Sequence, residues 1–204
     1  MRCFIALEPG RAWLETLEAG CAAWRALLPD WRWTRAEGRH LTLAFLGELG
    51  EDGSPAVEAA REAVRSAAGL PAPEIRFERF VLLPSRRKPR VLALGADGAS
   101  GGVRSAAALR ARVGSALEAA ARTRGIANPD AEADRAFLCH LTLARAPSGP
   151  GRKGAPPFDA AREFATMPVS AQASARFLAV TLFRSVLGPG GARYEALERA
   201  PLGL

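Results

Sequence analysis

Apolar positions divide the first quarter of the chain into alternating strands and helices. The apolar run at 2–8, RCFIALE, is typical of a buried β-strand, and a Pro-Gly pair ends it. Over residues 11–28 the apolar side chains recur every three to four positions, which predicts an amphipathic helix that stops at Pro29. The segment 31–34, WRWT, is a candidate for a short strand, and 39–47, RHLTLAFLG, is predicted to be a longer one.

The same alternation continues through the middle of the chain. Residues 54–68 favour a helix, with Ser54 as its cap and Pro55 in its first turn. The segment 74–84, EIRFERFVLLP, is predicted to be one strand, and the apolar run at 89–95, PRVLALG, is predicted to be another.

The order strand, helix, HLTLA strand then occurs a second time. After the strand at 89–95, a long helix is expected at 103–124 and a strand at 137–145, FLCHLTLAR. We interpret the chain as one domain, residues 1–204, built from two related halves of approximately 1–88 and 89–204.

The last quarter of the chain is expected to add further strands. Residues 147–157 form a loop rich in proline and glycine, followed by a short helical segment at 158–165. The strand at 176–187 and the segment 193–202 then form a plausible hairpin. Because few strands are joined through helices in strict βαβ alternation, we predict an α+β fold. It is expected to be bilobal with a pseudo-twofold axis, two antiparallel sheets, helices outside and a central cleft.

Both histidines of the chain, His40 and His140, open a copy of the pentapeptide HLTLA. In a strand, successive side chains point to opposite faces. His40 therefore shares a face with Thr42, and His140 shares one with Thr142, while the intervening leucines face the core. If the halves pack about a twofold axis, two imidazoles and two hydroxyls meet across one cleft.

This set of groups suits phosphoryl chemistry. One neutral imidazole can accept a proton from a nucleophile while the other, as imidazolium, protonates the leaving oxygen. The threonine hydroxyls can donate hydrogen bonds to phosphate oxygens. Duplication could also preserve the motif for packing, but packing explains the leucines and not the histidines and threonines. The near-symmetry leaves the two histidine roles interchangeable at this point.

Amino-acid composition indicates the kind of partner and the compartment in which this chemistry would occur. The net charge of +7 favours an anionic partner, although nearly all basic residues are arginines, which also fits a compositional bias. Three scattered cysteines fit buried thiols in a reducing compartment, and a zinc site is not expected. With no apolar run of membrane-spanning length and no signal peptide, we expect a cytoplasmic protein that does not associate with membranes.

Several stretches resemble the two-histidine phosphoesterases, and most closely the RNA 2′,3′-cyclic phosphodiesterases, also called the 2′-5′ RNA ligase family. The paired H-x-T-x motifs are the hallmark of that superfamily. The stretches that carry the resemblance are MRCFIALEP at 1–9, RHLTLAFLGE at 39–48, KPRVLALG at 88–95, FLCHLTLAR at 137–145 and YEALERAPL at 194–202.

The resemblance implies hydrolysis of a terminal 2′,3′-cyclic phosphate on RNA to a 2′-phosphate, with no metal or cofactor. It implies that His40 is the proton donor, that His140 is the proton acceptor, and that Thr42 and Thr142 hold the phosphate. The expected partners are RNA ends bearing a cyclic phosphate, tRNA fragments among the candidates, and the chain is expected to be a monomer. The reverse reaction, 2′-5′ ligation, is a second expected activity.

Residues next to the two motifs leave questions open. The family often has a basic residue where this chain has Ala44. Arg145 could contact phosphate, but strict alternation points it away from His140 unless the strand ends or bulges. Phe45 has the same parity, so core packing is its better interpretation. Cys139 is expected to be a buried thiol rather than a nucleophile.

Two alternatives to the RNA phosphodiesterase remain. One is a non-catalytic RNA or nucleotide binder with the same fold, and the other is a phosphodiesterase acting on a small cyclic nucleotide. The basic loops 85–90 and 151–154 could steer RNA phosphates, or they could be ordinary solvated loops. The four tryptophans are not spaced as a base-stacking platform and are expected mainly in the core.

Overall fold

The structure is a computed structural model. The described residues are 1–85, 88–130, 135–147, 174–188 and 191–203. The predicted helical segment at 158–165, nearly all of the loop at 147–157, and the basic segment 151–154 lie outside these residues.

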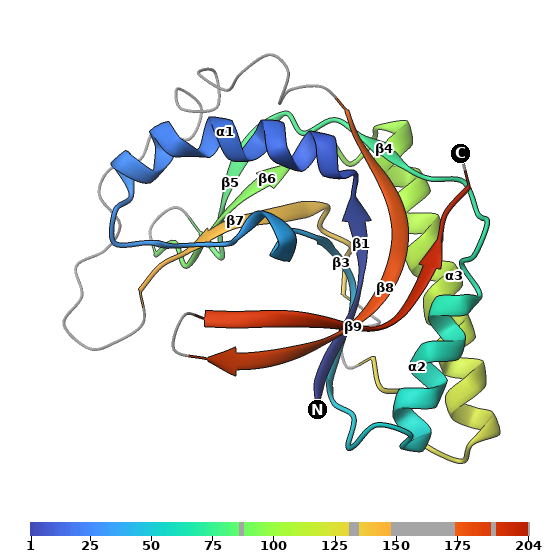
Figure 1. The fold of residues 1–204 in the computed structure, drawn as a ribbon. Coiled ribbons are helices and arrows are strands. Elements are labelled where there is room, and N and C mark those ends of the chain that lie inside the picture. The colour runs from blue at the N-terminus through green and yellow to red at the C-terminus, as the bar shows by residue number, and fades with distance from the viewer. Residues whose placement is uncertain (86–87, 131–134, 148–173, 189–190, 204) are drawn as a thin grey trace.

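The first sheet is antiparallel and contains five strands. Its main path runs β3-β1-β8-β4, and β9 pairs with β8 as a long hairpin (Figure 1). The strands are β1 (Arg2–Pro9), β3 (Leu41–Glu48), β4 (Glu74–Ile75), β8 (Ala175–Gly188) and β9 (Gly191–Pro201).

The second sheet is also antiparallel and has four strands in the order β2-β7-β6-β5. The strands are β2 (Arg32–Trp33), β5 (Arg79–Leu83), β6 (Val91–Gly95) and β7 (His140–Arg145). Each sheet draws strands from both parts of the sequence, on either side of residue 88. The division into duplicated halves stays a prediction.

Among the described residues, the α-helices α1, α2 and α3 cover the two sheets from outside (Figure 1). The helix α1 (Arg11–Leu27) lies over the second sheet, where Trp24 packs edge-on against Phe80 of β5 with ring centroids 4.7 Å apart. The helices α2 (Pro55–Arg65) and α3 (Gly101–Thr123) pack against each other and against the first sheet. A single 3-10 turn, η1 (Ala36–Gly38), leads into β3.

Serine side chains cap α2 and α3, and the cap at Ser54 is the one predicted from the sequence. The Ser54 hydroxyl accepts a hydrogen bond from the Val57 backbone N–H at 3.4 Å, and the Ser100 hydroxyl does the same for α3. The first turn of α3 lies directly on β4, and a Cβ added at Gly102 would be 1.8 Å from the Glu74 carbonyl oxygen. Only glycine allows this close approach of helix and strand.

The core lies between the sheets and the helices that cover them. In β1 the residues from Cys3 to Leu7 are all buried, and in β3 Leu41 and Leu43 are buried. Trp13, Trp24 and Trp31 are buried as well, which confirms the expectation that the tryptophans belong mainly to the core. The predicted α+β class with two antiparallel sheets and outer helices is therefore confirmed.

The prediction of one strand over 74–84 was wrong. Two short strands occupy this segment, and they belong to different sheets: β4 pairs with β8, and β5 pairs with β6. Between them the chain crosses from the first sheet to the second, with Phe77 buried against Trp13 at 5.6 Å between ring centroids. An apolar run shows that a segment is buried, but not that it stays in one sheet.

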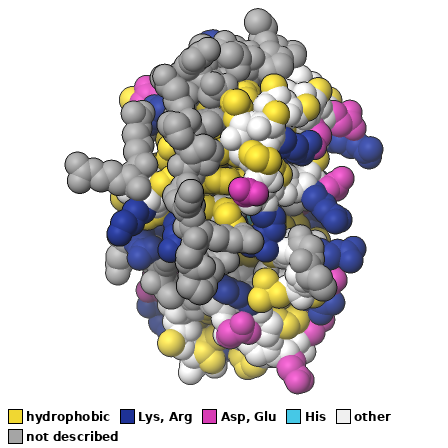
Figure 2. Space-filling model, turned by 90° about the vertical axis from the view of Figure 1, so that its left-hand side faces the viewer, with side chains coloured by type: hydrophobic (Ala, Val, Ile, Leu, Met, Phe, Trp, Pro, Cys, Tyr) yellow, Lys and Arg dark blue, Asp and Glu magenta, His cyan; other side chains and the backbone are white. Residues whose placement is uncertain are grey.

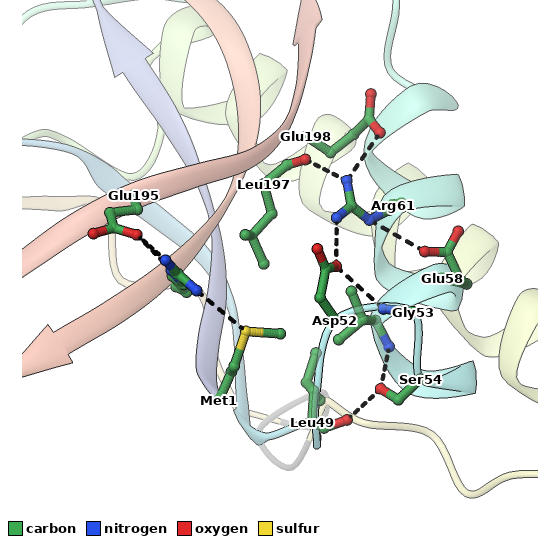
Figure 3. Close-up of polar contacts among 12 residues, drawn as sticks. Met1, Leu49, Asp52, Gly53, Ser54, Glu58, Arg61, Glu195, Leu197 and Glu198 are labelled. Atoms are coloured by element: carbon green, nitrogen blue, oxygen red, sulfur yellow. Dashed lines mark hydrogen bonds and ion pairs between the residues drawn. The ribbon is translucent and has the colours of Figure 1, made fainter.

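Arg61 of α2 ties the turn after β3 to the hairpin strand β9 (Figure 3). Its guanidinium pairs with Asp52 at 2.6 Å and with Glu58 at 3.3 Å, and it donates to the carbonyl oxygen of Leu197. It lies 3.8 Å from Glu198 as well. The Arg61 side chain is only 17% exposed, whereas Asp52 is 63% exposed, so Arg61 is the shielded member of a set of contacts that holds α2 against the sheet.

Candidate functional site

The two HLTLA segments lie side by side although they belong to different sheets. His40 immediately precedes β3, and His140 is the first residue of β7. The strands β3 and β7 contact each other where the two sheets meet (Figure 1). The antiparallel pairings that hold these strands bring the starts of both motifs together from positions one hundred residues apart.

Both imidazoles are anchored in the same way. The Nδ1–H of His40 donates to the Gly38 carbonyl oxygen at 2.9 Å, and the Nδ1–H of His140 donates to the Leu138 carbonyl oxygen at 2.9 Å. A carbonyl only accepts, so in the neutral rings the proton is assigned to Nδ1. The basic Nε2 of each ring is left for chemistry, which is the arrangement that a proton-transfer pair requires.

A β-bulge interrupts each motif strand at its second leucine. In β3, Thr42 is opposite Ala6 and Ala44 is opposite Ile5, so Leu43 has no partner. In β7, Thr142 is opposite Ala93 and Ala144 is opposite Leu92, so Leu143 has none. An extra residue of this kind reverses the inside–outside alternation of everything that follows it. Consequently Leu43 and Ala44 are both buried, as are Leu143 and Ala144.

The bulges bring a sixth residue of each motif onto the face that carries the histidine. We call this the cleft face: His40 and Thr42 on the first sheet, His140 and Thr142 on the second. Arg145 is exposed and shares the cleft face of β7, which resolves the parity question that the sequence left open. Phe45 is 46% exposed, so the interpretation of Phe45 as a core residue was wrong, and the bulge is the reason.

The carbonyl group at each bulge has a dedicated donor. The Leu143 oxygen accepts from the Thr34 backbone N–H at 2.8 Å, since β2 flanks β7 on that side. The strand β3 is at the edge of its sheet, and there the Nε of Arg110 donates to the Leu43 oxygen at 3.2 Å. A side chain of α3 thus replaces the missing neighbouring strand.

Arg110 also reaches the segment that leads into the second motif. Its Nη1 donates to the carbonyl oxygen of Arg135 at 2.8 Å, and its guanidinium carbon lies 5.8 Å from the centre of the Phe137 ring. One guanidinium therefore fixes the β3 bulge and the approach to His140 together. No pattern in the sequence indicated this role, because the partners are backbone oxygens distant along the chain.

An aromatic cluster surrounds His40. The imidazole lies 4.6 Å from the Phe4 ring, 5.2 Å from the Tyr194 ring in an edge-on geometry and 6.2 Å from the Phe183 ring, measured between centroids. These residues come from β1, β9 and β8, and none was identified as a site residue from the sequence. The one available hint was that Tyr194, the only tyrosine, lies in a predicted hairpin.

Burial among these rings lowers the pKa of His40 to about 4. The hydrogen bond to Gly38 opposes this shift, while the positive charges of Arg145 and His140 add to it. A charge acts on a neighbouring titration in this way only at short range. Arg145 and His140 are therefore near enough to His40 to disfavour its protonation, and in the free protein His40 is held neutral at pH 7.

The two threonines complete the cleft face. Thr42 and Thr142 are half-buried, and within the described parts of the chain neither hydroxyl has a hydrogen-bond partner. Hydroxyl groups held in a partly desolvated site without partners can donate to an anionic oxygen.

A pocket of about 470 Å³ opens beside His40. Its walls include Glu8, Leu178, Phe183 and Tyr194 from the first sheet, and Glu37 from η1. His40 forms part of the boundary between this pocket and the paired motifs, so a molecule whose phosphate lies at the two histidines could extend into it.

Cys139, next to His140, does not serve this chemistry. Burial raises the pKa of its thiol to about 12, so it stays protonated. Among the described residues there is no group of three or more His, Cys, Asp or Glu side chains placed to hold a metal ion. None of the helices in the described ranges has the length and apolar character required to cross a bilayer.

Basic side chains are spread over the surface rather than gathered at one point. Where side chains are described on the face that lies on the left of Figure 1, Lys and Arg are scattered among acidic and hydrophobic ones (Figure 2). Net positive charge alone would therefore not locate the site.

Comparison with known proteins agrees with this geometry. The model of the LigT-like phosphoesterase family matches residues 14–93, which contain the first motif. The crystal structure of TT0787 from Thermus thermophilus is 28% identical, with a TM-score of 0.61 over 98% of this chain and 97% of that one. In sequence and in fold, this chain is similar to the LigT-like phosphoesterases. Escherichia coli LigT shares its LigT-like fold at 23% identity, with a TM-score of 0.61 over 100% of this chain and 98% of LigT.

No curated protein matches the sequence significantly. The LigT fold has also been determined in complexes with phosphate and with 3′-AMP. The cleft face carries five residues that were predicted from the sequence: His40, Thr42, His140, Thr142 and Arg145. The predicted basic loop at 85–90 is described only in part and cannot be placed as a unit.

Proposed function

We propose that the protein is an RNA 2′,3′-cyclic phosphodiesterase that opens a terminal 2′,3′-cyclic phosphate to a 2′-phosphate. The observation that carries this proposal is the pair of imidazoles anchored identically through Nδ1, with both Nε2 atoms left for proton transfer. The structures of LigT with phosphate and with 3′-AMP support a cleft of this type that accepts a nucleotide phosphate.

The proposed reaction is an in-line displacement at phosphorus. The Nε2 of His140 accepts a proton from water, and the water oxygen forms a bond to phosphorus. The bond from phosphorus to the 3′ oxygen breaks, and the Nε2 of His40 gives that oxygen its proton. The hydroxyls of Thr42 and Thr142 and the guanidinium of Arg145 stabilise the negative charge that builds on the non-bridging oxygens.

This assignment places a demand on His40. Burial holds it neutral in the free protein, whereas a proton donor must be charged. The negative charge of the bound cyclic phosphate opposes the positive charge of Arg145, so we propose that substrate binding raises the pKa of His40 and recruits its proton. After turnover, His140 carries the proton taken from water and His40 has lost one, and exchange with solvent resets both rings.

The decisive test is product analysis on an oligoribonucleotide that ends in a 2′,3′-cyclic phosphate, with a chelator present throughout. We expect a 2′-phosphate product and a bell-shaped pH profile, since one imidazole must be neutral and the other charged. His40→Ala and His140→Ala should each reduce the rate by at least about 10²-fold. Binding of the RNA without product would instead identify a non-catalytic binder, and near-normal rates in both variants would exclude this mechanism.

Further parts of the proposal concern the setting of the reaction. We propose a cytoplasmic monomer that acts on RNA ends, tRNA fragments included, without a cofactor. Ligation through a 2′-5′ bond is the same path in reverse and is proposed as a second activity. The contribution of RNA beyond the terminal nucleotide is measured by comparing kcat/KM for an oligonucleotide with kcat/KM for a nucleoside 2′,3′-cyclic phosphate. Equal values would favour a small cyclic nucleotide as the substrate.

A further inference from the structure

The pocket beside His40 contains a carboxylate that the phosphodiesterase reaction does not use. Glu8 lies near the end of β1, and its neighbour Leu7 is paired with Leu41, which places Glu8 level with His40 across the two strands. It also lines the pocket. A carboxylate close to a phosphate site is electrostatically unfavourable unless it serves another purpose.

The Glu8 carboxylate is held firmly in place. Its Oε1 accepts a hydrogen bond from the hydroxyl of Thr181, which is fully buried, and a second from the Nε of Arg199 at 3.2 Å. Its other oxygen, Oε2, has no partner among the described residues. A carboxylate has about four acceptor positions, so at least two remain for a ligand.

The charges around the pocket do not suit a second phosphate. Three carboxylates line it, those of Glu8, Glu15 and Glu37. The guanidiniums of Arg11 and Arg199 also line it, but Arg11 is paired with Glu15 at 2.8 Å and Arg199 with Glu8. The balance favours a neutral ligand that offers hydrogen-bond donors.

Arg39 borders the pocket too. Its side chain is completely buried, and its guanidinium is bonded to Glu18 of α1, which also pairs with Arg25. Arg39 therefore anchors the start of the motif strand to α1.

Aromatic side chains supply the remaining walls. Phe183 and Tyr194 line the pocket together with His40, and their rings lie 6.3 Å apart between centroids. Flat apolar walls with a few fixed polar groups, in a volume of about 470 Å³, are typical of a site for a small planar ligand.

We propose that this pocket binds the base of the nucleotide that carries the cyclic phosphate, and that Glu8 selects the base. The inference rests on the proposed function, because the phosphate at the two histidines determines where the base falls. Guanine presents two adjacent donors, N1–H and the 2-amino group, to one carboxylate. Adenine and cytosine present one amino donor beside an acceptor, and uracil places carbonyl oxygens on both sides of its single N–H, so guanine is preferred most and uracil least.

The test compares the four nucleoside 2′,3′-cyclic phosphates as substrates. For the wild type we expect kcat/KM for the guanosine substrate to exceed that for the uridine substrate by at least about tenfold. In Glu8→Gln the ratio should fall to within about threefold, mainly through loss of guanosine turnover. Glu15→Gln is the matched control: it neutralises a carboxylate that lines the same pocket, and the guanosine preference should persist.

Each outcome separates the base site from the proposed reaction. Equal ratios in the wild type and Glu8→Gln, or an equal loss for both substrates, would overturn the role of Glu8 while leaving the phosphodiesterase intact. If no substrate turns over, calorimetry with guanosine 3′-phosphate and uridine 3′-phosphate still tests the base site. Tighter binding of guanosine 3′-phosphate that is lost in Glu8→Gln supports the proposal. Equal affinities for the two nucleotides in the wild type refute it. Should Glu8→Gln fail to fold, Glu8→Asp replaces it in the test. Glu8→Asp keeps the negative charge but has a side chain shorter by one methylene, so the preference for the guanosine substrate should weaken.

Discussion

The neutral state of His40 should be visible in the stability of the protein as a function of pH. The pKa of His40 lies at about 4 in the folded chain and near its ordinary value of 6.5 in the unfolded chain. As the pH falls through 6.5, the unfolded state takes up a proton that the folded state excludes, so unfolding becomes easier. The loss continues until the folded state is also protonated near pH 4.

The size of the effect follows from the separation of the two pKa values. A difference between 6.5 and about 4 corresponds to about 3 kcal/mol of unfolding free energy, because each pKa unit corresponds to about 1.4 kcal/mol. We therefore expect wild type to lose about 3 kcal/mol from this group between pH 7 and pH 4, in addition to losses from its carboxylates. His40→Gln does not titrate, so its curve should fall less steeply by that amount.

The assay is urea unfolding followed by circular dichroism at several pH values between 4 and 7.5. His140→Gln is the matched control, since it removes the other histidine and should retain the steep loss. Parallel curves for wild type and His40→Gln would refute the reasoning that burial dominates the titration of His40. With only two histidines in the chain, imidazole NMR resonances are assigned by the same two variants, and inorganic phosphate should raise the pKa of His40.

Other predictions address the two bulges, the cleft and the contacts of Arg61 on α2. Arg110→Met removes the donor to the Leu43 oxygen while keeping the aliphatic volume, and should lower the unfolding free energy by about 1–3 kcal/mol and reduce turnover. Phe45→Ala should destabilise by less than about 1.5 kcal/mol in the same urea assay, against about 2–5 kcal/mol for Leu43→Ala, because Phe45 is half exposed and Leu43 is buried. Arg145→Ala should raise the pKa of His40 measured by NMR and weaken inorganic phosphate binding measured by calorimetry; an unchanged pKa would place Arg145 away from the cleft. Arg61→Met should lower the unfolding free energy by about 1–3 kcal/mol with catalysis intact, since its partners lie on α2, the preceding turn and β9.

Alternation along the strands predicted the first three residues of each motif correctly. His40 and Thr42 share one face and the leucines another because a pleated strand permits nothing else. The prediction for Phe45 failed because a bulge depends on how the neighbouring strand pairs, and pairing is a property of two segments distant in sequence.

Long-range packing explains the other differences. The aromatic rings that depress the pKa of His40 come from strands near both ends of the chain, and no local pattern connects Phe4 with Tyr194. The segment 74–84 carries buried apolar side chains in both of its halves, yet it serves two sheets, because burial alone does not choose a partner strand. The helices, in contrast, were located within a few residues because their caps and periodicity are local.

The paired bulges also change how the motif should be defined when relatives are compared or variants are built. Side chains face the cleft at the histidine, two positions later and five positions later, a spacing that a pleated strand cannot produce. A library intended to alter the site would therefore vary position 45 on the first strand and position 145 on the second. Positions 44 and 144, one residue earlier, would instead have to stay small, because they lie in the core. The functional unit of each strand is thus a hexapeptide, and its last residue differs between the two copies: an aromatic ring on one side of the cleft and a guanidinium on the other.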